Sequence, residues 1–253
     1  MVKLVTGSGR PKASLSQHAY LTIRDAILRG DYPLGAALSR RKLAVKLGMS
    51  ILPVSEALQR LSSEGLVVSW PRVGTIVKIP TPQEIRGSFV IREALECQAA
   101  RLFAEKAPPA RRTELREMAD DLDKQWTNVN TTQVDIRERM LEIRKRHMQL
   151  HMDIAEASGV PALVQAIERN NVLVFATMYD SLLGYLYEPS DWHLQLMDAL
   201  VGNDPDRAEV AMRHHVRLGL EDLLERLEPY LHWDQSKLLS LREKKPVGAG
   251  RQK

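Results

Sequence analysis

The stretch Leu38–Val77, LSRRKLAVKLGMSILPVSEALQRLSSEGLVVSWPRVGTIV, carries the signals of two short helices joined by a tight turn and followed by a β-hairpin. The first helix is predicted from about Ser39 to Leu47, because Gly48 stands where a helix ends in the left-handed conformation. Ser50 is placed to cap a second helix, which ends near Gly65. This order of elements predicts a helix–turn–helix.

The second helix tolerates Pro53 in its first turn, where the backbone amide has no intrahelical partner. Its apolar stripe consists of Val54, Ala57, Leu58 and Leu61. Two β-rich runs, Leu66–Trp70 and Thr75–Ile79, flank residues 71–74, PRVG, which have the turn chemistry of a short hairpin. A helix–turn–helix with a trailing hairpin indicates a winged DNA-binding module, although a small helical bundle with a β-flap and no ligand would show the same pattern.

The charge of the chain is divided unevenly along its length. Residues 1–80 carry 12 Lys and Arg against 4 Asp and Glu, residues 81–241 carry 19 against 27, and residues 242–253 carry 5 against 1. The winged module is therefore cationic, as neutralisation of DNA phosphates requires, whereas the body is not. Residues 232–253 are predicted to form a basic tail, which is either merely solvated or adds nonspecific DNA affinity.

Residues 1–13 are expected to be a flexible arm, and an amphipathic helix over Ser14–Arg29 completes a module that spans residues 14–80. The inward residues of that helix are Leu15, Ala19, Ile23, Ala26 and Ile27. No apolar run approaches the roughly 20 residues that span a bilayer, and the opening MVKLVTGSGR lacks the apolar core of a secretory signal. The single cysteine, Cys97, can form no intrachain disulfide. We therefore expect a cytoplasmic protein with no membrane partner.

Several polar side chains of the module are placed for contact with DNA. Arg and Gln form paired hydrogen bonds with base edges, whereas Lys and amide groups mainly hold phosphates. The candidates lie at the start of the first motif helix, along the second and at the hairpin tip: Arg40, Arg41, Lys42, Ser50, Ser55, Gln59, Arg60, Arg72 and Gly74. Any single one of them could instead be solvated surface.

Over about residues 15–80 the module resembles the winged-helix DNA reader of the GntR family of transcription regulators. The resemblance rests on one continuous pattern: Gly30, Gly48-Met49-Ser50, Pro53-Val54, Glu56-Ala57-Leu58, Arg60-Leu61, Glu64-Gly65-Leu66 and Gly74. It implies binding to double-stranded DNA, and it aligns Arg41 with a position that the family uses on DNA. Two family arginines are replaced here by Ile51 and Ser55, so the family's usual operator is not expected, and Ile51 could instead meet a thymine methyl group.

A helical domain is predicted over residues 81–231. Thr81 and Glu84 have the spacing of a capping box, with Pro82 at the first helical position. No convincing strand follows, and breaker residues separate helices at about 82–106, 110–127, 134–158, 161–187, 190–201 and 205–231. The predicted fold is therefore mainly α: an N-terminal winged helix–turn–helix with a small β-hairpin, followed by an all-α bundle of six or seven helices.

Histidines fall on the apolar stripes of three bundle helices: His147 and His151 on the third, His193 on the fifth and His215 on the sixth. Their stripe neighbours include Met140, Ile143, Leu150, Ile154, Leu196, Met197, Leu200, Ala208, Met212 and Leu218. For one histidine, a hydrogen-bonded core residue would be the better interpretation. Four on convergent stripes favour a shared divalent ion, Zn²⁺ or Ni²⁺, because such an ion accepts several nitrogen lone pairs.

The bundle also resembles the FCD effector-binding domain of the FadR subgroup of GntR regulators, over about residues 82–231. The matching motifs are Arg92-Glu93-Ala94-Leu95-Glu96, His151 followed by Ala155-Glu156-Ala157-Ser158-Gly159, and His193 with Asp204, Met212 and His215. In metal-binding members of the family, an Asp four residues before the first histidine joins three histidines around the metal, and an organic acid often completes the shell. His147 stands at the Asp position here, which removes one negative charge and makes the site more dependent on an anionic ligand. Metal-free members of the family also exist, in which case His147 would hydrogen-bond His151.

Two further residues are candidates for effector binding. Arg92 lies on an apolar helix face, where its guanidinium needs a partner, either Glu96 one turn away or a ligand carboxylate. Asn171 is a weaker candidate for a polar contact with the ligand.

These features predict a ligand-responsive transcription regulator, most often a repressor, that binds a palindromic operator as a homodimer and responds to a small carboxylate held at the metal. A metal-free regulator with another effector and an architectural DNA-binding protein without a sensor are the alternatives. An enzyme is not expected, because residues 147–151, HMQLH, lack the glutamate of the catalytic HExxH motif.

Overall fold

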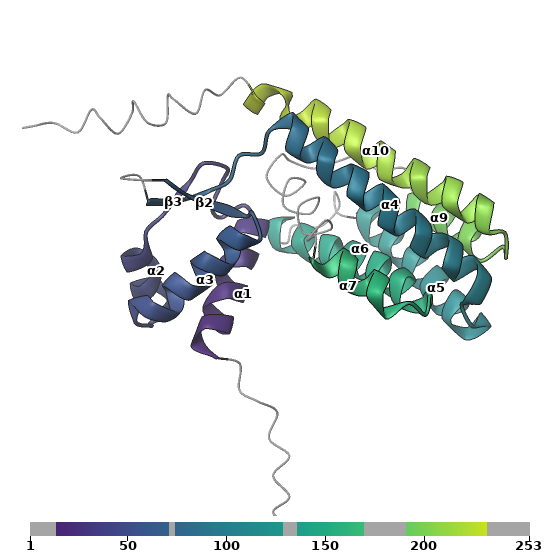
Figure 1. The fold of residues 1–253 in the computed structure, drawn as a ribbon, viewed down its shortest axis with the longest axis horizontal. Coiled ribbons are helices and arrows are strands. Elements are labelled where there is room, and N and C mark those ends of the chain that lie inside the picture. The colour runs from purple at the N-terminus through teal and green to yellow at the C-terminus, as the bar shows by residue number, and fades with distance from the viewer. Residues whose placement is uncertain (1–13, 71–73, 129–135, 170–190, 232–253) are drawn as a thin grey trace, which may run out of the picture. The chain divides into compact units, whose positions relative to one another are not determined.

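The computed structural model describes residues 14–70, 74–128, 136–169 and 191–231. Backbone contacts divide the chain into two compact units. The smaller unit consists of the described residues up to Ile27 together with Leu34–Lys78. The larger unit consists of Leu28–Pro33 together with the described residues from Ile79 onward. Each unit is built from its own elements, which Figure 1 labels.

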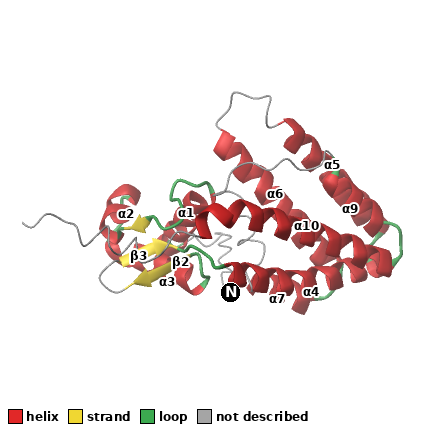
Figure 2. Cartoon of the chain, turned by 90° about the horizontal axis from the view of Figure 1, so that it is seen from above, coloured by secondary structure: helices red, strands yellow, loops and turns green. Residues whose placement is uncertain are grey.

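The smaller unit contains three helices and a three-stranded antiparallel sheet of order β1-β3-β2. Its elements are α1 (Leu15–Leu28), β1 (Ala37–Leu38), α2 (Arg40–Leu47), α3 (Ile51–Ser63), β2 (Val67–Trp70) and β3 (Gly74–Val77). Figure 2 shows the strands in yellow among these helices. The winged helix–turn–helix predicted from the sequence is therefore confirmed. The two-residue strand β1 was not predicted, because it is too short to show an alternating pattern.

Local signals at the ends of α2 and α3 explain where these helices begin and end. The Ser39 hydroxyl accepts a hydrogen bond from the Lys42 amide, and Gly48 adopts the left-handed conformation at a φ of 63°. Ser50 occupies the N-cap position of α3, but its hydroxyl makes no capping hydrogen bond. The predicted position of that cap is right, whereas the predicted side-chain bond is absent.

The core of the smaller unit lies where α1 and α3 bury their apolar stripes. The fully buried residues include Ala19, Ile23, Ile27, Val54, Ala57, Leu58 and Leu61. Each large apolar side chain buried in this way contributes about 1.5–3 kcal/mol to folding. Leu15 was expected in the same core but is 63% exposed, because it begins α1 and projects beyond the packed region.

The larger unit is all-α in its described part. Its helices are α4 (Pro82–Lys106), α5 (Pro109–Thr127), α6 (Ile136–Ala157), α7 (Pro161–Arg169), α9 (Trp192–Leu200) and α10 (Pro205–Leu231). Helix α4 begins with the predicted capping box between Thr81 and Glu84, and it runs alongside α10 in Figure 1. A helix is predicted over 161–187, of which α7 accounts for Pro161–Arg169 and the rest lies outside the described residues. None of the described helices is long and apolar enough to cross a membrane.

Arg112 on α5 forms hydrogen bonds with backbone carbonyl groups at the carboxyl ends of two helices. Its guanidinium donates to the carbonyl oxygens of Ala104 (2.7 Å) and Ala107 (2.8 Å) at the end of α4, and to that of Val201 (3.2 Å) at the end of α9. These carbonyls have no partner within their helices, and a cation at this place also opposes the negative end of the helix dipole.

We therefore expect Arg112→Met to lower the free energy of unfolding by about 2–4 kcal/mol, because it leaves several partly buried carbonyls without a donor. Urea denaturation followed by circular dichroism measures this change. Arg116→Met is the matched control, since Arg116 lies on the same helix and only pairs with a half-exposed Asp198. It should cost less than about 1 kcal/mol. Equal losses in the two variants would contradict the assigned role of Arg112.

Candidate functional site

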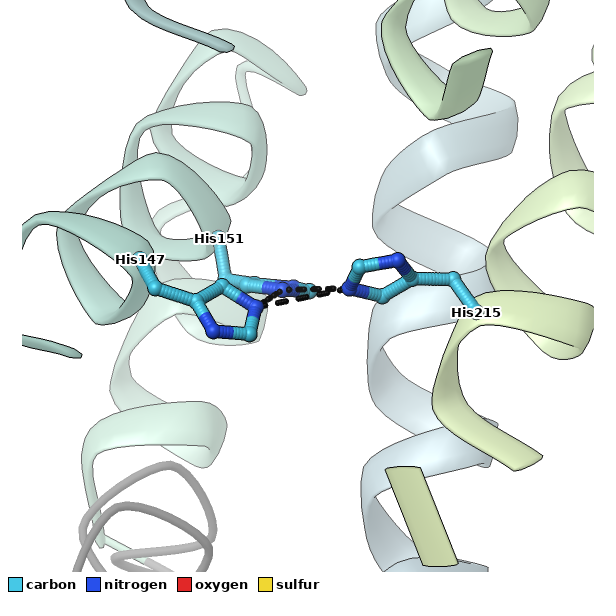
Figure 3. A group of neighbouring side chains, drawn as sticks. All are labelled: His147, His151 and His215. Carbon is cyan, nitrogen blue, oxygen red and sulfur yellow. Dashed lines mark hydrogen bonds between the residues drawn. The ribbon is translucent and has the colours of Figure 1, made fainter. Parts of the chain in front are cut away.

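Three histidines from two helices face one another inside the larger unit. His147 and His151 are one turn apart on α6, and His215 projects toward them from α10, as Figure 3 shows. Their Nε2 atoms are separated by 2.8 Å (His147 to His151), 3.2 Å (His151 to His215) and 3.4 Å (His147 to His215). His151 and His215 are almost completely buried.

These distances fit a divalent metal ion. A tetrahedral zinc ion with Zn–N bonds of about 2.0–2.1 Å holds its ligand atoms about 3.3 Å apart, close to the separations of 3.2 and 3.4 Å. The 2.8 Å between His147 and His151 is shorter and is a hydrogen-bond distance. A neutral imidazole has one proton for its two nitrogens, so three Nε2 atoms that converge on one place are poorly satisfied by hydrogen bonds among themselves. A cation that accepts all three lone pairs removes this conflict.

Glu96 on α4 holds the proton of the His151 ring at Nδ1. Its Oε2 lies 2.5 Å from His151 Nδ1, and its Oε1 accepts a hydrogen bond of 2.7 Å from Arg92 Nε. A proton shared with the carboxylate at Nδ1 leaves the Nε2 lone pair directed at the other histidines. Metal-binding histidines are commonly oriented in this way by a second group. Burial raises the pKa of Glu96, but the charge of Arg92 and the contacts with His151 and Arg92 outweigh this and lower it to about 2, so the carboxyl group is ionised.

The imidazoles themselves are in their neutral form at neutral pH. Burial is the main cause that lowers the pKa of His147 and of His215 well below the usual value, and the neighbouring histidines lower both further. Burial also lowers the pKa of His151, although Glu96 opposes that shift. A neutral imidazole is the form that binds a metal.

His193 lies beside this group on α9. Its ring centroid is 4.6 Å from that of His147 and 5.6 Å from that of His215. The set of nitrogens within 4.8 Å of one another, however, consists of those of His147, His151 and His215. The structure thus brings three of the four predicted metal ligands together and places the fourth at their edge.

Asp123 on α5 orients His193 and was not singled out from the sequence. Its Oδ1 lies 2.5 Å from His193 Nδ1, and its two oxygens accept the backbone N–H groups of His193 and Leu194 in the first turn of α9. A signal was present, because Asp123 is an acidic residue in phase with the buried Leu115, Ala119 and Leu122. A carboxylate on an apolar stripe indicates a buried partner.

Arg92 pairs with Glu96, which is one of the two partners that the sequence left open. It is 5% exposed, and its Nη2 lies 3.4 Å from His151 Nε2, at the edge of the histidine group. A guanidinium at this place favours an anion as the next component of the site. Asn171, the other predicted effector contact, lies outside the described residues.

The smaller unit presents its predicted DNA contacts mainly on α2 and α3. Arg40, Arg41 and Lys42 are exposed in the first turn of α2. Cations are unfavourable at the amino end of a helix dipole, so helix stability does not explain three in succession, and their contact with DNA stays a prediction. Ser50, Gln59 and Gly74 are exposed, Ser55 is half-buried, and Arg72 lies outside the described residues.

Arg60 differs from the other candidates because its guanidinium is engaged within the unit. It donates to Glu64 Oε1 (3.0 Å) and to Gln17 Oε1 (2.7 Å), and it stacks over the ring of Tyr20 at 3.7 Å. The Tyr20 hydroxyl donates to Glu64 as well. These contacts connect α1 to α3, so Arg60 has a structural role, whereas its contact with DNA stays a prediction.

Comparison with known proteins assigns each of the two units to a known protein family. Residues 15–77 match the family described as "Bacterial regulatory proteins, gntR family", and residues 88–218 match the FCD domain. A "Probable D-xylose utilization operon transcriptional repressor" of Paenarthrobacter nicotinovorans is 29% identical over 202 residues, which cover 75% of this chain and 80% of the relative. The "HTH-type transcriptional repressor RspR" of Escherichia coli K12 is 26% identical over 211 residues, covering 82% and 88%.

Among solved structures, E. coli McbR/YncC aligns with a TM-score of 0.68 at 22% identity, over 86% of this chain and all of that one. A GntR-type putative transcriptional regulator from Rhodococcus sp. RHA1 aligns with a TM-score of 0.67 at 20% identity, over 83% and 97%. At these identities the likeness establishes the fold alone.

Proposed function

The chain belongs to the GntR family of bacterial regulatory proteins with an FCD domain, and from this premise we propose that it is a repressor whose operator affinity is controlled by a small carboxylate. It is a DNA-binding transcription regulator and not an enzyme. The proposal adds three components to that assignment, namely a metal site, an acidic effector and a homodimer on a palindromic operator. Each has its own experiment.

The observation that carries the sensor proposal is the convergence of three imidazole Nε2 atoms, 2.8–3.4 Å apart, next to the buried Arg92. In this proposal His147, His151 and His215 hold Zn²⁺ or Ni²⁺, with His193 as the fourth candidate. The ion would supply a Lewis acid that binds a carboxylate oxygen.

The charges around the site explain why the effector should be an anion. A divalent ion and Arg92 bring three positive charges, whereas Glu96 and Asp123 bring two negative charges. The excess of one positive charge is buried, and a buried charge is costly unless an opposite charge pairs with it. A carboxylate provides that charge, together with oxygen atoms that accept hydrogen bonds from Arg92.

The effector acts on DNA binding by preferring one arrangement of the regulator over another. Coupling of this kind amounts to about 1–3 kcal/mol, which corresponds to a change of about 5–150-fold in operator affinity. The experiment selects duplexes from a random pool with the full-length protein and then measures their binding with and without a panel of mono-, di- and tricarboxylates. If no acid on the panel altered the affinity, and neither did a chelator, the carboxylate sensor would be contradicted, which leaves a metal-free regulator with another effector or an architectural DNA binder.

A homodimer is proposed because one winged module contacts too few base pairs for useful specificity, whereas two-fold protein symmetry matches a palindrome. Sedimentation velocity at micromolar concentration should give a species of about twice the 28.6 kDa chain mass. Selected duplexes should contain two inverted half-sites about one helical turn apart. A monomer on and off DNA, or a single half-site, would contradict this part of the proposal.

A further inference from the structure

Trp192, the first residue of α9, lies against the histidine group although no sequence pattern points to it. Its indole stacks on the His215 ring with the centroids 4.1 Å apart and the planes 28° from parallel. The centroids of the His193 and His147 rings lie 5.1 Å and 6.0 Å from that of the indole. Trp192 therefore contacts the site from the side of α9, whereas Arg92 reaches it from α4.

The indole nitrogen of Trp192 is buried and has no acceptor among the described residues. An indole N–H can only donate a hydrogen bond, and buried donors in native proteins nearly always have a partner. Nδ1 of His215 is in the same situation. When Nε2 of a neutral imidazole binds a metal, Nδ1 carries the proton, so the stacked pair presents two N–H groups that lack an acceptor.

We propose that Trp192 is a ligand-contact residue, whose indole N–H donates to a carboxylate oxygen of the bound anion while its ring face packs against His215. This inference rests on the proposed function and adds a specificity residue to that site. The Trp192 N–H and, with an ion on Nε2, the His215 Nδ1–H are donors without an acceptor among the described residues, so a molecule that pairs with them must supply lone pairs. In this site the carboxylate is bound by the ion, by N–H groups of Arg92 on α4 and by the indole N–H of Trp192 on α9.

The test uses Trp192→Phe, which keeps an aromatic ring for His215 and removes the N–H donor together with part of the indole ring system. Trp70→Phe is the matched control, because Trp70 on β2 also has a buried indole nitrogen with no acceptor in the described part of the chain but belongs to the smaller unit. The full-length proteins are loaded with Zn²⁺, their metal content is measured, and they are titrated calorimetrically with malonate.

Trp192→Phe is expected to keep the wild-type zinc content and to bind malonate about tenfold more weakly or worse, whereas Trp70→Phe binds like wild type. Tryptophan fluorescence gives a second readout. Malonate should change the emission of wild type and of Trp70→Phe, and this change should vanish in Trp192→Phe.

Two results would overturn the inference, and they are distinguishable. If Trp192→Phe bound zinc and malonate as tightly as wild type, Trp192 would be a packing residue and the proposed sensor would stand. If wild type itself bound no zinc or no malonate, the proposed carboxylate sensor would fail and the role of Trp192 would fail with it.

Discussion

His215→Ala should abolish the stabilisation of the protein by Zn²⁺, whereas His214→Ala, one residue earlier on the same helix, should leave it intact. His215 is 3% exposed and directs Nε2 at His147 and His151, whereas His214 is exposed. An ion that binds only the folded state at a thousand times its dissociation constant adds about 4 kcal/mol to the free energy of unfolding. Urea denaturation with and without Zn²⁺ measures this gain.

The two variants change the same residue type on the same helix, so a general effect of losing a histidine would appear in both. The gain from Zn²⁺ should remain near 4 kcal/mol in His214→Ala and fall to nearly zero in His215→Ala. Circular dichroism before the titration checks that both variants are helical. If zinc stabilised His215→Ala as much as wild type, the ion would bind elsewhere.

Replacing Arg40, Arg41 and Lys42 together by alanine should lower operator affinity by about two to four orders of magnitude. All three side chains are exposed in the first turn of α2. Alanine is the best helix former, and removing cations from the amino end of a helix relieves an unfavourable dipole interaction. The variant should therefore fold at least as well as wild type, so a loss of binding reflects lost DNA contacts.

The control for this variant removes the same positive charge from the larger unit, as Arg86→Ala, Lys106→Ala and Lys124→Ala, three exposed cations. Fluorescence anisotropy with the selected operator over a range of salt concentrations compares the two proteins. In a plot of log affinity against log salt concentration, the slope of the α2 variant should be smaller in magnitude than that of wild type by about three. The slope of the control variant should equal that of wild type. Equal losses in both would mean that net charge, rather than α2, provides the affinity.

Features encoded by neighbouring residues could be predicted from the sequence. The left-handed Gly48, the capping box of Thr81 and the winged module all follow from signals a few residues apart. The inward face of α6 was also largely correct, since Met140, Ile143, Leu150, His151 and Ile154 are buried, whereas His147 on the same face is half-buried. A helical period fixes which side of a helix faces the core, and the histidines lie on that side.

Features that depend on how helices pack against one another could not be predicted. Leu218 was placed on the buried stripe of the last helix but is 37% exposed, because a stripe does not show how far a neighbouring helix covers it. Trp192 was missed for the same reason, and the apolar stripe that marks Asp123 as a buried carboxylate does not identify its partner. Their importance arises from contacts with His193 and His215, which are 70 and 23 residues away in the chain. The approach of His151 and His215 to 3.2 Å is likewise a property of the packed bundle.

The claim that the histidine group is a metal centre is tested most directly by the metal content of untagged protein. Plasma mass spectrometry should find about one tightly held Zn or Ni per chain in wild type, and none in His151→Ala, which removes the imidazole that Glu96 orients. His214→Ala should retain the wild-type content. No metal in wild type, or the same content in His151→Ala as in wild type, would contradict the account.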